Sequence, residues 1–226
     1  MLNVVCVLWQ GNFRKRTFNS EWVIKLKNMV ERNLPIPHNF YCLSNVDIPT
    51  INVIPLKHNY PGWWSKIELF RPDLPIEGRI LYIDLDSLIV NDLSELANFD
   101  SKFAILNRIS MEEKTNYLVK SWVSGNDKLP GRIIRNYNSS AMLFDKGQGQ
   151  EIYTEFTEQV MEDFRGDQDW IGYLKPGLDK LPNKWFCKLK NCIDGSIYND
   201  IKIIGCLPYK NDQASELFPW VKKIWK

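Results

Sequence analysis

RILYIDLDSLIV, residues 79–90, is the stretch that decides the fold of this chain. Four apolar, β-prone residues, Ile80–Ile83, lead directly into Asp84, Leu85 and Asp86, and a second apolar run follows at once. In an extended chain alternate side chains share a face, so the two carboxylates are expected to point the same way while Leu85 turns toward the core. The pattern predicts a central buried strand that ends in two neighbouring acids.

These paired acids are candidate metal ligands. Two carboxylates between buried apolar runs need a partner that offsets their desolvation. Mg²⁺ and Mn²⁺ prefer oxygen ligands and are held by one or two carboxylates, with substrate phosphates completing the shell. We therefore expect Asp84 and Asp86 to bind Mn²⁺ or Mg²⁺; the alternative is a solvated turn.

Composition limits the class of protein. The 226 residues are 44% hydrophobic and 13% aromatic, which suits one well-filled domain over 1–226. A formal net charge of +2 without a long basic run gives no reason to expect a nucleic-acid partner. No window approaches about 18 uninterrupted apolar residues, so no transmembrane helix is expected. Five cysteines without a Cys-x-x-Cys pair, and a start that lacks signal-peptide features, predict a reduced, cytoplasmic protein.

Predicted strands and helices alternate along the chain. Apolar runs predict strands over residues 2–9, 38–44, 51–56, 80–83, 103–106, 141–144 and 201–204. Helical spacing predicts a first helix that is capped by Ser20. Further helices are predicted over 62–72, over 92–96, around 112–122 and over 151–164. Such alternation is typical of an α/β domain with a mostly parallel central sheet and helices on both faces.

The order of five landmarks makes the chain resemble the GT-A fold glycosyltransferases, closest to family 8, the glycogenin and bacterial galactosyltransferase type. The landmarks are residues 4–9, the WWSK run at 63–66, and residues 81–86, 138–144 and 166–169. The resemblance covers nearly the whole chain and implies a single GT-A (Rossmann-like) domain. It also implies a retaining, metal-dependent transfer of a hexose from a nucleotide sugar, with UDP the expected nucleotide, to a glycan, lipid-linked or protein acceptor.

The resemblance implies roles for the residues that bind the donor. Asp84 and Asp86 would hold the cation against the diphosphate, and the cation would neutralise charge on the leaving group. Lys66 would reach the phosphates or ribose as a point charge, unless it is a solvent-facing helix lysine. Leu8 and Trp9 would line the base pocket, because ligands of open α/β sheets bind outside strand ends; for Trp9 a core position is the alternative.

A second group would handle the sugar. Asn138, Ser139 and Ser140 offer amide and hydroxyl groups to sugar hydroxyls; a strand-entry turn and a glycosylation sequon are the alternatives. Asp167 and Gln168 resemble the residues beneath the sugar ring, and with Asn138 they form the expected catalytic set. An acid and an amide there stabilise an oxocarbenium-like centre while the acceptor attacks from the leaving-group face. The alternative is a loop that follows a helix.

The chain departs from the family pattern after its last predicted strand. The family usually supplies a third metal ligand there from a His-Gly pair, whereas residues 204–210 are IGCLPYK. Cys206 could ligate, but a thiolate suits zinc better than Mn²⁺ or Mg²⁺. Either two acids and phosphates hold the metal alone, or activity is reduced or lost. Lys210 is still expected to cover the diphosphate, and His38 and His58 are expected to be structural or exposed.

The tail, residues 219–226, interleaves two tryptophans with three lysines. Such a segment can lie at an anionic membrane surface, which would suit a lipid-linked acceptor and a peripheral location. The alternative is that it packs back on the domain.

Two other functions stay open. Asp84 and Asp86 also resemble the nucleophile strand of haloacid-dehalogenase-type phosphatases, with residues 166–169 as the later acidic motif. That strand normally lies near the amino terminus, however, and Leu88 stands where Thr or Val is expected. The second alternative is a non-catalytic protein of the GT-A fold that binds a nucleotide sugar or glycan, because the histidine is missing.

Overall fold

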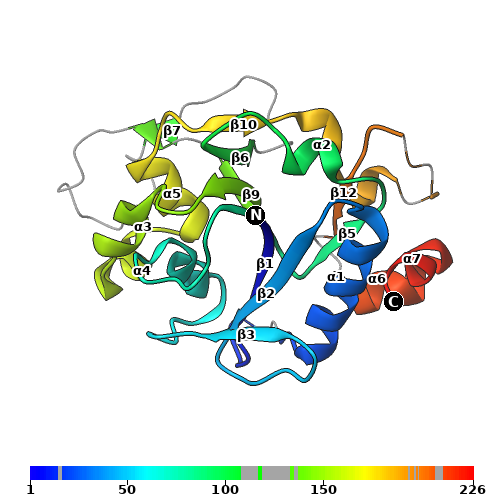
Figure 1. The fold of residues 1–226 in the computed structure, drawn as a ribbon, viewed down its shortest axis with the longest axis horizontal. Helices are drawn as coiled ribbons and strands as arrows, with labels where there is room; N and C mark the ends of the chain where they lie inside the picture. The colour runs from blue at the N-terminus through cyan, green and yellow to red at the C-terminus, as the bar shows by residue number, and fades with distance from the viewer. Residues whose placement is uncertain are drawn as a thin grey trace.

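The computed structural model describes residues 1–14, 17–107, 117–118, 133–134, 137–192, 194–195, 197, 199–206 and 211–226. Its centre is a seven-stranded sheet with the order β10-β6-β9-β4-β1-β2-β3 (Figure 1). The strands of this sheet are β1 (Leu2–Leu8), β2 (His38–Ser44), β3 (Asn52–Pro55), β4 (Arg79–Ile83), β6 (Phe103–Asn107), β9 (Tyr137–Asp145) and β10 (Asp179–Leu181).

The sheet is mostly parallel, as the sequence predicts. β1 pairs in parallel with β2 and with β4, β2 with β3, and β6 with β10. Only β9 runs against its neighbours in this sheet, β4 and β6. Because β9 is antiparallel, its first residues lie beside the carboxyl end of β4, where Asp84 N donates to Ser140 O over 2.9 Å. This reversal brings residues 138–140 next to the paired acids.

Side chains of β1 alternate between two hydrophobic clusters, one on each face of the sheet. Cys6 and Leu8 point into the cluster that packs against helix α1 (Ser20–Asn33). Val5 and Val7 point into the cluster that includes the 3₁₀ helix η1 (Gly62–Phe70). Both faces are therefore covered, which explains why the central strands are apolar on both sides.

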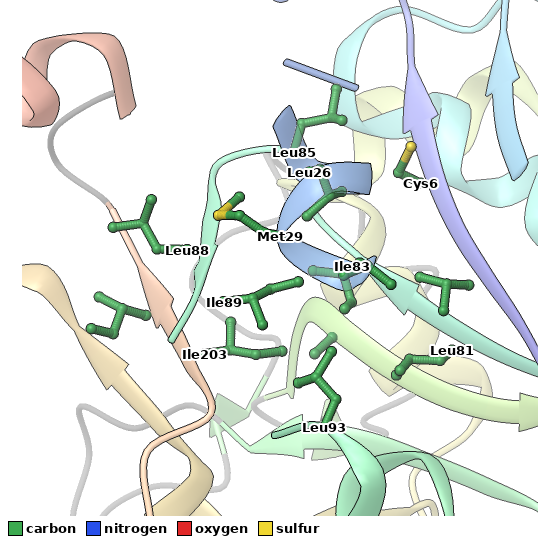
Figure 2. Close-up of a cluster of buried hydrophobic side chains, with 14 of the residues drawn as sticks. Cys6, Leu26, Met29, Leu81, Ile83, Leu85, Leu88, Ile89, Leu93 and Ile203 are labelled. Carbon is green, nitrogen blue, oxygen red and sulfur yellow. The ribbon is translucent and has the colours of Figure 1, made fainter. Parts of the chain in front are cut away.

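Helices supply both covering layers (Figure 1). Besides α1 and η1, the described helices are α2 (Ser94–Ala97), α3 (Gln150–Thr154), α4 (Glu158–Asp163), α5 (Asp167–Leu174), η3 (Asn183–Trp185), η4 (Leu189–Asn191), α6 (Asn211–Leu217) and α7 (Pro219–Ile224). Figure 2 shows the interior of the α1 cluster, where Leu26 and Met29 lie near Ile83 and Ile89. All four are fully buried, and each contributes roughly 1.5–3 kcal/mol of burial free energy.

A second, three-stranded sheet lies beside the first and was not predicted. It has the order β11-β12-β5, from β11 (Phe186–Lys188), β12 (Ile203–Gly205) and β5 (Ser87–Ile89). The strand predicted over 201–204 therefore exists at 203–205 but belongs to this small sheet. The two-residue strands β7 (Tyr117–Leu118) and β8 (Ile133–Ile134) pair with each other. Most of the helix predicted around 112–122 falls outside the described residues. At residues 117–118 the prediction is wrong, because these residues form the strand β7.

Two helix predictions need correction. The cap of α1 is Asn19, whose Oδ1 accepts from Glu21 N over 3.1 Å, and Ser20 is the first helical residue. Both residue types cap well, so only the backbone geometry distinguishes them. The single helix predicted over 151–164 is broken into α3 and α4, because Thr157 is extended and Phe156 turns into the core beside Trp64. The apolar spacing was correct, but the continuity was not.

The carboxyl-terminal helix α7 packs back on the domain. Val221 and Trp225 are buried, and the Trp225 ring lies 5.0 Å from that of Trp22. Arg32 donates to the carbonyl of Ile224 over 2.6 Å. Among the described residues, no helix has the length and apolar character that crossing a bilayer requires.

Candidate active site

A cavity of about 720 Å³ lies where β1 and β4 end. Each wall comes from a different element, as at the strand ends of other open α/β sheets. The lining residues include Val7 and Trp9 at the end of β1, Gly62, Trp63, Ser65 and Lys66 from η1, Asp84–Ser87 after β4, Asn138–Ser140 from β9, Arg165–Gln168 before and within α5, and Lys188, Lys190, Gly205 and Cys206 from the small sheet and the segments next to it.

Lys66 is the centre of a charged network in this cavity. Its Nζ lies 2.9 Å from Asp84 Oδ1, 3.4 Å from Asp167 Oδ2 and 3.1 Å from Ser139 Oγ. The hydroxyl of Ser139 in turn donates to Asp167 Oδ2 over 2.5 Å. Tyr82 donates to Asp84 Oδ1 over 2.5 Å. The network joins η1, β4, β9 and α5, four elements that are far apart in sequence.

The local structure of η1 places Lys66 inside rather than in solvent. Gly62 has φ +59°, and a Cβ there would lie 2.1 Å from the Phe13 ring, so the turn into η1 requires glycine. Ser65 Oγ then donates to Gly62 O over 2.6 Å. As a result only 11% of the Lys66 side chain is exposed. The solvent-facing alternative for this lysine is wrong.

The network shifts the pKa values of its members. Burial opposes the charge on Lys66, but Asp167 and Asp84 outweigh it, so the pKa of Lys66 is raised and the ammonium persists. Burial raises the pKa of Asp167, and Lys66 and Ser139 only partly counter this. Burial, and then Asp84, raises the pKa of the Tyr82 hydroxyl, which therefore stays a hydrogen-bond donor. Asp167 thus depends on Lys66 for its charge.

The paired acids sit in a tight turn between β4 and β5, where Ser87 N donates to Asp84 O over 3.2 Å. Both line the cavity and both are partly exposed, whereas Leu85 is buried in the core as predicted. Asp84 accepts hydrogen bonds from Lys66 and Tyr82. The charge of Asp86 acts on Lys66 more weakly than that of Asp84. The two acids therefore lie in a turn that lines the cavity, and the alternative of a turn in open solvent is wrong.

The donor set fits a hard cation that takes its other ligands from phosphates. Among the described residues, no group of three or more His, Cys, Asp or Glu side chains is placed to hold a metal. Cys206 is fully buried beside Asp86, and its amide lies 3.3 Å from Asp86 O. Burial, and then Asp86, raises the pKa of the Cys206 thiol. A cysteine sulfur is also a soft ligand that matches zinc better than Mn²⁺ or Mg²⁺. Of the residues that the structure describes, Asp84 and Asp86 are the candidates to hold such a cation.

The other predicted residues are not all brought to the cavity. Trp9, Asn138, Ser139 and Gln168 line it. The Gln168 side chain makes no hydrogen bond to another of the described residues, and it lines the cavity, where a ligand could reach its amide. Leu8 is fully buried in the α1 cluster and points away from the cavity. Lys210 lies outside the described residues.

Several lining residues were missed by the sequence analysis. One of them is Phe13, whose ring meets that of Trp63 edge-on at 4.8 Å. Arg14, which is not a lining residue, lies over the Trp63 ring, 4.7 Å from its centroid. These residues form an aromatic wall near Trp9. Their mutual contact gives no periodic signal, because it depends on how the loop after β1 folds over η1.

Comparison with known proteins finds no match to the sequence but several matches to the structure. No family model matches the sequence, and no curated protein matches it. The structure is similar to the galactosyltransferase LgtC in complex with donor and acceptor sugar analogs, with TM-score 0.65 and 15% identity over 99% of this chain and 96% of LgtC. It is also similar to the bifunctional glycosyltransferase WbbM (TM-score 0.58, 16% identity, 99% and 51% of the chains).

A third similar structure is the glycosyltransferase GlyE of Streptococcus pneumoniae, with TM-score 0.58 and 13% identity over 100% of this chain and 66% of GlyE. At these identities the likeness concerns the fold. The chain has the GT-A, Rossmann-like fold that the sequence resemblance predicts.

Proposed function

We propose that this protein is a retaining glycosyltransferase that moves a hexose from a nucleotide sugar, with UDP the expected nucleotide, to a glycan, lipid-linked or protein acceptor. The observation that carries the proposal is the buried Lys66 network, which joins Asp84 to Asp167 at the floor of the cavity. It links the candidate diphosphate site to the candidate sugar site through one cation. The GT-A fold supports the same conclusion.

The chain's residues divide the work along the cavity. The aromatic wall with Trp9 offers surfaces for a nucleobase, next to the end of β1. Asp84 and Asp86 would hold Mn²⁺ or Mg²⁺, which supplies charge neutralisation to the leaving diphosphate when bound. Lys66 keeps Asp84 oriented and stays protonated, so its charge also favours phosphate nearby.

The sugar end would use Asp167, Gln168 and Asn138. Asp167 is held by Lys66 and Ser139, so it acts as a fixed negative charge rather than as a mobile base. Such a preorganised charge favours an oxocarbenium-like centre. The Gln168 amide, at the start of α5, can accept or donate to the sugar or to the incoming acceptor hydroxyl. Attack from the leaving-group face would then retain configuration.

The phosphatase alternative is less well supported. Its nucleophile would be Asp84, but that carboxylate is bound by Lys66 and Tyr82 and lies in a turn after β4. An attacking carboxylate needs a free oxygen directed at phosphorus. Hydrolysis of p-nitrophenyl phosphate that is abolished by Asp84→Asn would favour the phosphatase over the transferase.

Asp86→Asn is expected to abolish Mn²⁺-dependent binding of UDP while the fold remains intact. The variant keeps the shape of the side chain but removes one of two candidate ligand charges. Isothermal calorimetry with UDP, in Mn²⁺ and in EDTA, measures the effect, after a thermal-shift comparison of UDP, GDP, CDP and ADP identifies the nucleotide.

Asp92→Asn is the matched control, because Asp92 is a turn acid near the surface that does not line the cavity. Equal UDP affinity of wild type and Asp86→Asn in Mn²⁺ would overturn the metal assignment. Binding of UDP without transfer or donor hydrolysis over a broad donor and acceptor panel would instead support the non-catalytic alternative.

Contact with a membrane through residues 219–226 is a separate prediction. Because Val221 and Trp225 are buried against the domain, α7 offers mainly its exposed lysines, Lys222 and Lys223, to a bilayer. We expect weak, salt-sensitive sedimentation with phosphatidylglycerol vesicles and none with phosphatidylcholine. The double variant K222Q/K223Q should lose it, and equal sedimentation of wild type with both lipids would contradict an electrostatic contact.

A further inference from the structure

One wall of the cavity has no role in the proposed function so far. It consists of Lys188, at the end of β11, and Lys190, in η4. We propose that these two lysines bind phosphate oxygens of a ligand held opposite Asp86, an inference that rests on the proposed function. The ligand class is a phosphate ester or diphosphate, carried by the donor or by a phosphorylated acceptor.

The small sheet places the lysine wall in register with the acidic turn. Lys188 is the partner of Gly205 across β11 and β12, and Gly205 is the partner of Ser87 across β12 and β5. Ser87 directly follows Asp86. Neighbouring strands lie about 4.8 Å apart, so the backbones of Lys188 and Ser87 are separated by about 10 Å. This separation leaves room for a phosphate group between a lysine and the acids.

Gly205 keeps the space between the two walls open. The nearest heavy atom to a Cβ built at this position is Cys187 O, at 4.0 Å, so nothing fills the cavity there. Its φ is not in the left-handed region, so the backbone does not require glycine. The absence of a side chain therefore matters for the cavity rather than for the strand.

Two other cations that line the cavity form ion pairs within the protein. Lys66 is engaged by Asp84 and Asp167, and Arg165 Nε lies 2.6 Å from Asp169 Oδ2. Lys190 is exposed at the cavity and pairs with no other described residue. Lys190 is therefore an exposed cation of the cavity wall that an entering anion can reach. Among the described residues, no third His, Cys, Asp or Glu side chain completes a metal site with Asp84 and Asp86, so the lysines would carry part of the countercharge of the phosphates.

The test measures binding rather than turnover. UDP, UMP and uridine are titrated by calorimetry into wild type, Lys188→Gln, Lys190→Gln and the double variant, each in Mn²⁺ and in EDTA. Lys184→Gln is the matched control, because Lys184 lies just before β11 in an exposed pair with Asp200 and does not line the cavity. Loss of two charge-assisted contacts is expected to weaken the affinity for UDP by about tenfold to a hundredfold in the double variant. Uridine should bind all proteins alike, and the loss should be larger in EDTA.

The outcomes separate the two sources of phosphate and the two proposals. Weaker UDP binding in the double variant assigns the lysines to the donor. Unchanged UDP binding with lost transfer to a phosphorylated lipid acceptor, but not to a neutral sugar, assigns them to the acceptor. Unchanged UDP binding together with unchanged transfer to both acceptors overturns this inference alone. Failure of wild type to bind any nucleoside diphosphate overturns the proposed function as well.

Gly205→Val gives an independent check, since valine suits a strand and would occupy the space between the walls. We expect Gly205→Val to weaken UDP binding as strongly as the double lysine variant does, while the melting temperature changes little. Wild-type UDP affinity together with wild-type transfer to the phosphorylated lipid acceptor would show that no phosphate lies there and would contradict the proposal.

Discussion

Lys66→Met is expected to abolish sugar transfer and to lower the free energy of unfolding by about 3–5 kcal/mol at neutral pH. Methionine replaces the apolar stem of lysine but lacks the cation that Asp84, Asp167 and Ser139 share. Asp167 is only 4% exposed, so it would be left as an uncompensated buried charge. Urea denaturation at pH 7.5 and a donor hydrolysis assay measure the two effects.

The pH dependence distinguishes this explanation from a simple packing defect. Burial already raises the pKa of Asp167 with Lys66 present, and without the cation it should rise further. A raised folded pKa means that the native state binds more protons than the unfolded state, so stability falls as pH rises. The loss begins near the unfolded value of about 4 and continues up to the folded pKa. The stability gap between wild type and Lys66→Met should therefore widen with pH over this window.

In wild type, the titration of Lys66 itself should cause no loss of stability over this pH window. The pKa of Lys66 is raised above its unfolded value, so its stabilisation is complete below the unfolded pKa and disappears only as pH rises through the folded one. Lys57→Met is the control, because Lys57 forms an exposed pair with Asp73 just before η1. Exposed pairs contribute little. A stability gap for Lys66→Met that does not depend on pH would refute the electrostatic explanation.

The sequence predicts the central strands and the acidic turn because both are encoded locally. Apolar runs define β1 and β4, and a run that ends in two acids must end where something can solvate or bind them. The same period-two rule could have excluded Leu8 from the cavity. Neighbouring residues of a strand face opposite ways, so Leu8 and Trp9 cannot both line one pocket, and Leu8 follows Cys6 toward α1.

What the sequence did not predict depends on pairing between distant segments. The antiparallel insertion of β9 decides which residues meet Asp84, and no periodicity specifies it. Lys188 comes beside the acidic turn only through β12, which pairs with β11 on one side and β5 on the other. The interruption between α3 and α4 also leaves the four-residue apolar spacing intact. In each case the local pattern is compatible with more than one tertiary arrangement.

Glu68→Gln is expected to destabilise the protein by about 3–5 kcal/mol at neutral pH. Glu68 is fully buried, and its carboxylate accepts from Lys57 N over 2.6 Å, from His58 N over 2.9 Å and from Arg71 Nη1 over 2.9 Å. A glutamine offers one accepting oxygen and one donating amide group, so at least one backbone amide would face another donor. The Arg71 charge would also lose its buried partner, and Asp73, which is exposed and 3.7 Å from Arg71 Nε, cannot replace it.

This prediction concerns the site as well as stability, because Glu68 ties the loop at residues 57–58 to η1, the element that carries Lys66 into the cavity. Asp73→Asn removes an exposed carboxylate that pairs with the side chains of Lys57 and Arg71, and it should change the unfolding midpoint in urea far less. In Glu68→Gln the loss of UDP affinity should exceed that of Asp73→Asn even at temperatures where both are folded. Comparable midpoints for the two variants would mean that η1 is held by its packing against β1 and β4 and that the buried carboxylate is not needed to place Lys66.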